Sequence, residues 1–203
     1  MMKETDWVES IKELLEKQLT HCPSLSSNFR ISTQCRLPYA LEIMTYPKTG
    51  DGVLFAEGYP KSQRFATDLL IYEEAQKQIK PRIIIEAKYS KRLTTHEAIV
   101  YSHKAAQHKA VTPYLRYGIM LGKMEEDTPL PGRLFRHGVN FDFMISFKKA
   151  KLTTAEKDSF VELINSEWRF SEQIEKMFSE NRSRDRKRYF MLQNALHLKE
   201  IGD

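Results

Sequence analysis

A run of β-branched residues with charges at its end stands near the middle of the chain: Ile83-Ile84-Ile85-Glu86-Ala87-Lys88. Polar residues flank the run on both sides, a pattern that indicates a short central strand covered on both faces. Residues two apart in a strand point to the same face, so Glu86 and Lys88 share one face and Ala87 takes the other. Charges at the end of an apolar strand cost desolvation energy unless a metal, a phosphate or each other compensates it. We therefore expect a functional site where this strand ends.

A second predicted strand carries one acid in an apolar context. This strand covers Arg64–Tyr72, and its Asp68 lies eighteen residues before Glu86. If the two strands pair, Asp68 and Glu86 converge on one hard cation, with Lys88 beside it. Such a constellation is suited to phosphodiester hydrolysis. The alternative is a structural salt bridge between Glu86 and Lys88.

Length and composition indicate a single intracellular domain. The 203 residues can bury a substantial core, and we take residues 1–203 as one domain. Hydrophobic residues make up 41% and charged residues 29% of the chain, as in ordinary globular proteins. No apolar stretch is long enough to span a bilayer, and the N-terminus lacks the apolar core of a signal peptide. Cys22 and Cys35 form no metal-binding spacing, so a reduced, cytoplasmic protein is expected.

Positive charge is concentrated around the candidate site. The net charge is +5, but residues 77–123 contain ten Lys and Arg against two acids, Glu86 and Glu97. Residues 151–203, by contrast, contain ten basic and ten acidic residues. A polyphosphate ligand would need such a local field. The alternative is a solvated basic face.

Periodicity and turn residues predict a mixed α/β order of elements. They indicate a helix from residue 5 or 6 to about 21, strands over 29–33, 39–46 and 64–72, a polar link over 73–80, the strand at 83–88, a helix from Thr94 to about Val111, a strand over 116–121, a loop over 125–137, a strand over 139–147, and helices over 153–180 and 189–199. Thr94 and Glu97 form a capping-box pattern at the start of their helix. The predicted fold is a central mixed sheet flanked by helices, with a helical C-terminal extension from about residue 153.

This arrangement resembles the PD-(D/E)XK nuclease superfamily, which has the restriction-endonuclease-like fold. The resemblance is carried by Asp68, by Glu86-Ala87-Lys88 and by the order of elements, and it covers roughly residues 5–123. Thr67 stands where the family name has proline. The resemblance implies that Asp68, Glu86 and Lys88 are catalytic and that Asp68 and Glu86 bind the metal.

The resemblance also implies Mg²⁺ as cofactor, which suits two carboxylates, waters and phosphate oxygens. The family often adds a glutamate from the first helix. Glu9, Glu13 and Glu16 are the candidates, and we choose Glu13 as a further metal ligand. Lys88 would orient the attacking water or neutralise charge on the phosphate.

The predicted function is that of a Mg²⁺-dependent DNA endonuclease, a type II restriction-type or related defence enzyme. Double-stranded DNA is the expected partner, and cleavage of both strands by one site per chain implies a homodimer. The phosphate contacts that we predict come from Lys91, Arg92, Lys104 and Lys109. Base contacts would come from loops such as 44–60 or 125–137. The alternatives are a repair or junction-resolving nuclease of the same fold and a non-catalytic DNA-binding subunit.

Overall fold

The computed structural model describes residues 2–20, 25, 28–42, 61–90, 92–123 and 132–180. Along the chain these ranges form α1 (Glu4–Leu19), β1 (Phe29–Glu42), β2 (Lys61–Ala75), β3 (Gln78–Tyr89), α2 (Thr95–Val111), β4 (Arg116–Gly122), α3 (Gly132–His137), β5 (Phe143–Ser146) and α4 (Thr154–Glu180). The helix expected over residues 189–199 lies outside the described residues.

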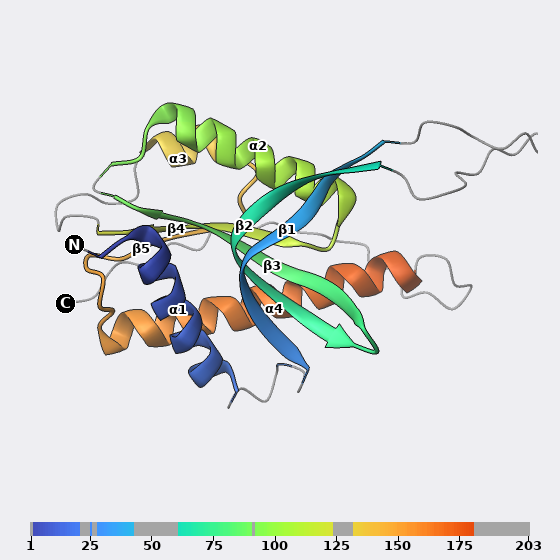
Figure 1. Cartoon of the computed structure of the whole chain (residues 1–203), viewed down its shortest axis with the longest axis horizontal. Coiled ribbons are helices and arrows are strands. Elements are labelled where there is room, and N and C mark those ends of the chain that lie inside the picture. Colours follow the sequence, from blue (N-terminus) through green and yellow to red (C-terminus); the bar gives the residue numbers. More distant parts are fainter. Residues whose placement is uncertain are drawn as a thin grey trace, which may run out of the picture.

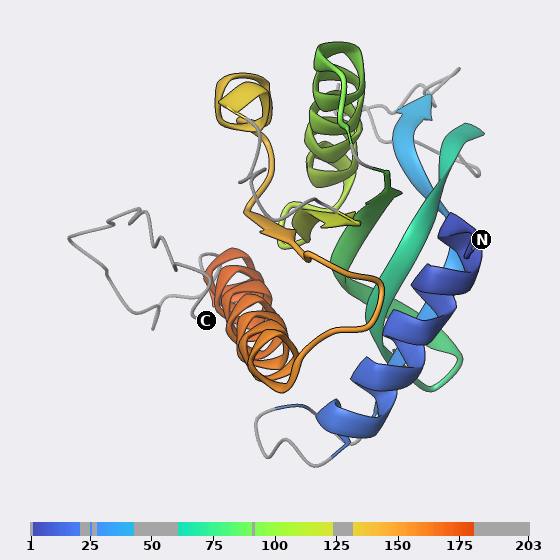
Figure 2. The same ribbon diagram turned by 90° about the vertical axis from the view of Figure 1, so that its left-hand side faces the viewer.

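The strands form one mixed sheet in the order β1-β2-β3-β4-β5 (Figure 1). β1, β2 and β3 are antiparallel neighbours, whereas β3, β4 and β5 run parallel. Helices α2 and α3 cover one face of the sheet, and α1 and α4 cover the other (Figures 1 and 2). The predicted α/β class, with a mixed sheet flanked by helices and a helical C-terminal region, is confirmed. That residues 1–203 form one domain stays a prediction.

Each face of the sheet has its own apolar core, because side chains alternate along the strands. Leu69, Ile83 and Ile85 pack with α1 and α4, where the largest buried side chains are Trp7 and Trp168. On the other face the core contains Leu37, Leu70, Ile84, Leu93, Ala98, Ala105, Leu115, Tyr117, Ile119, Leu121, Leu134 and Phe141. The isoleucine run of β3 is fully buried, as expected for a central strand.

Ion pairs fasten α4 to the sheet at the end remote from Glu86. The guanidinium of Arg82 in β3 is 2.8 Å from Glu73 of β2 and 2.7 Å from Glu175 of α4. Arg116 of β4 lies 2.6 Å from Glu167 of α4. These contacts fix the long C-terminal helix against the starts of β3 and β4.

Several expected elements differ in the structure. The two strands predicted before residue 46 are one strand, β1, which accommodates Pro38 with a register shift between Pro38 and Ala40. The polar link over 73–80 is wrong: β2 and β3 form a hairpin whose turn, Gln76-Lys77, has positive φ at both residues, as primed turns require.

The later loop and strand also differ. Part of the expected loop is α3, and the strand predicted over 139–147 is restricted to β5. The residues just before β5 run as a loop that docks on β4, where the backbone N–H of Asp142 donates to Tyr117 O at 2.8 Å. The Asp142 carboxylate accepts from the N–H of Tyr117 at 2.7 Å, so a side chain rather than a backbone carbonyl pairs with β4 here, and the regular pairing begins at Phe143. Among the described helices, none combines the length and the hydrophobicity that a membrane crossing requires.

Gly118 tests the packing between β4 and β5. A Cβ at this position would overlap the ring of Phe143, its partner in the neighbouring strand. We expect Gly118→Ala to lower the free energy of unfolding by about 1–3 kcal/mol, because the buried ring must shift. Gly132→Ala is the matched control: a Cβ at Gly132 meets nothing within 4 Å, so stability should hold or rise slightly. Urea denaturation measures the free energy of unfolding of both variants. Equal stability of the two variants would contradict this account of the packing.

Candidate active site

The candidate site forms where β2 leaves β3. The two strands pair from Ala75↔Gln78 to Leu69↔Ile85, and beyond Leu69 strand β2 pairs with β1 alone. At this point the carboxylate of Asp68 replaces the missing backbone partner: the N–H of Ala87 donates to Asp68 Oδ2 at 2.8 Å. The sheet thus opens at Asp68, and a side chain satisfies the exposed strand edge.

Asp68 and Glu86 lie on the same face of the sheet. Extending the register by one residue places Asp68 opposite Glu86, and directly opposed residues share a face. Leu70 and Ile84, one alternation further along, belong to the core under α2, so the two carboxylates face α2 as well. Lys88 follows on that same face. The expected geometry is present, whereas the catalytic and metal-binding roles of these residues stay predictions.

Glu86 is a buried carboxylate with two donors on a single oxygen. Only 2% of the residue is exposed. Its Oε1 accepts from Lys104 Nζ at 2.8 Å and from the Tyr117 hydroxyl at 2.6 Å. Burial raises the pKa of Glu86, the ammonium of Lys104 opposes this rise, and the negative charge of Asp68 adds to it. Both donors use Oε1, so neither of them engages Oε2.

Lys88 pairs with Glu97 rather than with Glu86. Its Nζ is 2.6 Å from Glu97 Oε1, and this hydrogen bond raises the pKa of Lys88. Glu97 also completes the predicted capping box, since its Oε2 accepts from the N–H of Thr94 at 2.7 Å. The alternative of a Glu86–Lys88 salt bridge is therefore not what the structure has.

The first helix brings Glu4, not Glu13, to the end of β3. Glu4 Oε2 accepts from the N–H of Tyr89 at 2.7 Å, and its charge contributes to the raised pKa of Lys88. Glu13 is exposed and lies nine residues further along α1, about 13.5 Å along the helix axis. Sequence reasoning missed Glu4 because we took the helix to start after it. Glu4 is thus the acid of α1 that bonds to the end of β3, next to Lys88, and metal binding by Glu13 stays a prediction.

Gln34 was also missed, and it lies beside Asp68. Its φ is 53°, a left-handed conformation that is rare for a residue other than glycine. The side-chain Nε2 donates to Asp68 Oδ1 at 3.3 Å. Asp68 is therefore held by β3 on one side and by β1 on the other, and no sequence signal pointed to this contact.

The predicted phosphate-binding residues differ in what they contact. Lys104 Nζ bonds to Glu86, and Lys109 Nζ lies 3.0 Å from Asp142. The residue Arg92 is exposed, and Lys91 lies outside the described residues. The two helical lysines are therefore engaged in ion pairs, which leaves Arg92 as the described candidate with an exposed position.

The carboxylates of the site fit a small hard cation. Within the described part of the chain, no three His, Cys, Asp or Glu side chains are grouped as a ready-made metal site. Mg²⁺ does not require one, because it keeps several waters and binds through one or two carboxylates together with substrate phosphates. The buried Glu86 and the half-buried Asp68 supply such a pair, and oxygen is the ligand that this ion prefers.

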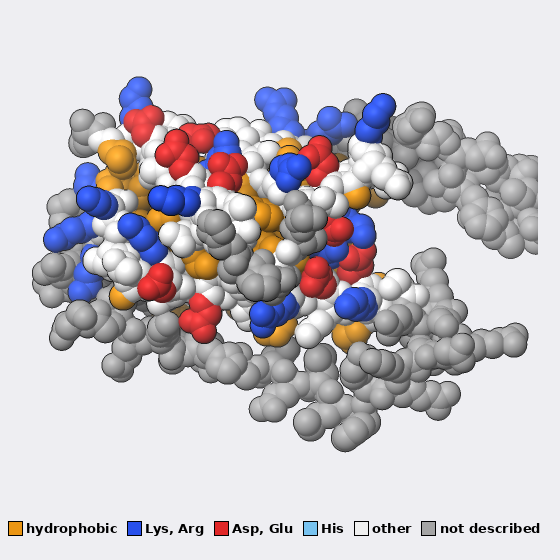
Figure 3. Space-filling view, turned by 90° about the horizontal axis from the view of Figure 1, so that it is seen from below, with side chains coloured by type: hydrophobic (Ala, Val, Ile, Leu, Met, Phe, Trp, Pro, Cys, Tyr) orange, Lys and Arg blue, Asp and Glu red, His pale blue; other side chains and the backbone are white. Residues whose placement is uncertain are grey.

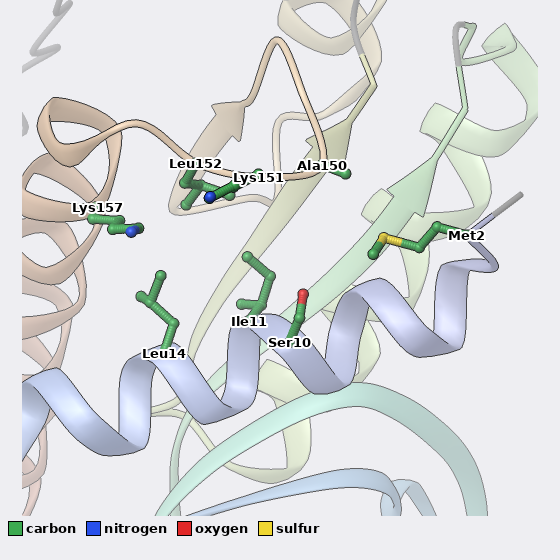
Figure 4. Close-up of a pocket in the computed structure, with 8 residues that line it drawn as sticks. All are labelled: Met2, Ser10, Ile11, Leu14, Ala150, Lys151, Leu152 and Lys157. Carbon is green, nitrogen blue, oxygen red and sulfur yellow. The ribbon is translucent and has the colours of Figure 1, made fainter.

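A pocket elsewhere on the molecule has different chemistry. It has a volume of about 340 Å³ and lies between α1 and the segment before α4, lined by Met2, Ser10, Ile11, Leu14, Ala150, Lys151, Leu152 and Lys157 (Figure 4). The lining contains no carboxylate and none of the predicted site residues. Acidic and basic side chains are interspersed on the face of α1 and α4 (Figure 3). We assign no function to this face.

Comparison with solved structures gives distant structural similarity. No protein-family model matches the chain, and no curated protein matches it. The chain is similar to a solved structure described as the crystal structure of a complex of the pre-specific restriction endonuclease BsaWI with DNA, with a TM-score of 0.41 and 11% sequence identity. The match covers 89% of this chain and 64% of that chain, so this chain spans less than two thirds of its length.

The Lys88–Glu97 pair predicts a pH-dependent contribution to stability. Hydrogen bonds from Lys88 and from the backbone of Thr94 lower the pKa of Glu97 to about 2. The pair therefore stabilises the fold above the ordinary carboxyl pKa of about 4.5, and this stabilisation is lost as the pH falls towards 2. Glu97→Gln keeps a capping-box residue but loses the charge, so we expect a loss of about 1 kcal/mol at pH 7 that shrinks between pH 4.5 and pH 3.

Glu156→Gln is the matched control for this measurement. Glu156 caps α4 in the same way, accepting from the N–H of Thr153 at 2.7 Å. Its Oε1 accepts from the backbone N–H of Lys148 at 3.4 Å, but within the described part of the chain it forms no ion pair with a charged side chain, so its substitution should cost less at pH 7. Urea unfolding across this pH range compares the two variants. A Glu97→Gln loss that stays constant with pH would show that the Lys88 pair is not its source.

Proposed function

We propose that this chain is a Mg²⁺-dependent DNA endonuclease. The observation that carries the proposal is the position of Asp68 and Glu86, two carboxylates on one face of the sheet at the point where β2 leaves β3, with Lys88 on the same face. A divalent cation at paired carboxylates lowers the pKa of a bound water and stabilises charge on a phosphate. The donor set, one buried and one half-buried carboxylate, supports this chemistry.

The side chains of the site have distinct tasks in this proposal. Asp68 and Glu86 hold the cation, and the hydrogen bond from Ala87 N fixes the orientation of Asp68. Lys88 orients the attacking water or neutralises charge on the phosphate, for which its ammonium must turn from Glu97 towards the substrate. Glu4 lies at the adjacent end of β3 and takes the place that we had given to Glu13.

Double-stranded DNA is the substrate that we propose, with a restriction or related defence role. The local basic charge of residues 77–123 supports a polyanionic substrate. Cleavage of both strands by a chain with one such site requires two copies, so we propose a homodimer whose two-fold axis coincides with that of the DNA target. Assays on linear duplex, plasmid and four-way junction separate a restriction-type enzyme from a junction-resolving one.

Removal of Asp68 should abolish cleavage. We expect Asp68→Ala to slow Mg²⁺-dependent plasmid cleavage by about 100-fold or more, because one of the two metal carboxylates is lost. DNA affinity, measured by fluorescence anisotropy with Ca²⁺ in place of Mg²⁺, should fall little or rise, since a negative charge near the phosphates has been removed.

Asp158→Ala is the control for the lost charge. Asp158 is exposed on α4, on the opposite face of the sheet, so this variant should cleave as the wild type does. Lys88→Ala should behave like Asp68→Ala. Equal cleavage by the Asp68 variant and the wild type would mean that the active site lies elsewhere. If the wild type cleaves none of the DNA substrates, the alternative of a non-catalytic DNA-binding protein is favoured.

Salt dependence tests the phosphate contacts. If the basic segment holds a duplex, the logarithm of affinity should fall linearly with the logarithm of salt concentration, with a slope of about −0.9 per phosphate neutralised. Neutralising Lys91 and Arg92 together should flatten the slope by about two units. Anisotropy titrations over a range of salt concentrations measure it, and an unchanged slope would mean that the substrate enters by another route.

A further inference from the structure

Lys104 is the buried cation that the proposed chemistry leaves unexplained. It belongs to α2, yet its side chain reaches across to the point where β2 and β3 separate, and only 15% of it is exposed. We had expected it to contact a DNA phosphate. A side chain this buried, with its ammonium on a carboxylate, is poorly placed for that task.

The position of Lys104 is formed by several groups besides Glu86. Its Nζ donates to Ala66 O of β2 at 3.4 Å as well as to Glu86 Oε1 at 2.8 Å. The ammonium also lies 5.4 Å from the centre of the Phe65 ring and 5.7 Å from that of Tyr101, within the range of cation–π attraction. Lys104 therefore bridges the two diverging strands and is held even apart from Glu86.

This contact restricts how Glu86 can bind a cation. Oε1 already accepts from Lys104 and from the hydroxyl of Tyr117, so Oε2 is the oxygen that neither donor occupies. A divalent cation on Oε2 would then lie within a few ångströms of the Lys104 ammonium. Like charges at that separation repel strongly inside a protein, where water screens them poorly.

We propose that Lys104 is a positioning residue that presents Oε2 of Glu86 and weakens divalent-cation binding in the absence of DNA. This inference rests on the proposed function, because it assigns Asp68 and Glu86 to the cation. A phosphate group brings negative charge and further oxygen ligands, so substrate and cation favour each other's binding. The cation is then held mainly when DNA is present.

Manganese titration of the DNA-free protein tests this inference without measuring cleavage. Free Mn²⁺ is followed by electron paramagnetic resonance at pH 8.5, where protons compete least for the carboxylates. We expect Lys104→Met to bind Mn²⁺ about tenfold tighter or more than the wild type, because the repelling charge is gone. Lys104→Arg keeps the charge and should stay within about threefold of the wild type.

Two further variants test whether the effect depends on a positive charge at position 104 in particular. Lys109→Met removes a lysine of the same helix that pairs with Asp142 instead, so Mn²⁺ affinity should not change. Lys104→Gln keeps a donor without the charge and carries the same expectation as Lys104→Met. Unchanged or weaker Mn²⁺ binding in the neutral Lys104 variants overturns the inference. So does a failure of both to fold while Lys104→Arg folds, since the pair would then be structural.

Asp68→Asn distinguishes this failure from that of the proposed function. If Mn²⁺ binding by the wild type disappears in Asp68→Asn but is unaffected by Lys104→Met, the carboxylate site stands and the role of Lys104 is refuted. If Asp68→Asn binds Mn²⁺ as the wild type does, the proposed metal site itself is wrong, and with it the inference about Lys104.

Discussion

The burial of the Glu86 carboxylate is the constraint on which the rest of the site depends. A charged group that is 2% exposed is stable in a protein only when neighbouring groups replace the lost water. Here the replacement comes from two elements that are distant in sequence, α2 through Lys104 and β4 through Tyr117. Moving either element would remove one of these two donors from the buried carboxylate, so the packing of α2 and β4 also determines the chemistry of the site.

The separation of β2 from β3 makes room for this compensation. A continuous ladder would place backbone hydrogen bonds where Lys104 now enters, because its ammonium reaches both Ala66 of β2 and Glu86 of β3. Asp68 closes the gap by accepting from Ala87 N, so the same carboxylate that we assign to a cation also ends the ladder. The two oxygens of Asp68 have different partners in the fold. Oδ2 accepts from the strand β3, and Oδ1 accepts from the side chain of Gln34.

The sequence predicted the parts of the site that depend on one strand or one helix turn. Alternation in β3 places Glu86 and Lys88 on a common face, and the spacing of Thr94 and Glu97 predicted the cap of α2. What it could not predict were contacts set by packing. Glu4 meets Tyr89 across 85 positions of chain, which no local pattern encodes.

The hairpin turn between β2 and β3 and the start of β5 differ from the sequence prediction. The turn Gln76-Lys77 adopts positive φ without the Gly or Asn that normally marks such a turn. The sequence pattern therefore predicted a polar link instead of a hairpin turn. Before β5, the Asp142 carboxylate accepts from the N–H of Tyr117 in β4, which interrupts an alternating pattern that favours a longer strand. Before β5, therefore, a tertiary contact outweighs the propensity of the residues.

In the proposed function, the charges around the site suit one divalent cation within a basic segment. Burial raises the pKa of Tyr101 to about 12, and the negative charges of Glu4, Asp68, Glu86 and Glu97 add to this rise, so all four carboxylates act on this side chain. Two ammonium groups, Lys88 and Lys104, pair with two of them. Four carboxylates against two ammonium groups leave two negative charges, which one divalent ion would neutralise. Arg82 and Arg116 of the basic segment pair with acids of β2 and α4, so in the proposed function a polyanion would meet exposed residues such as Arg92, and attraction of the cation and of the substrate need not compete for the same groups.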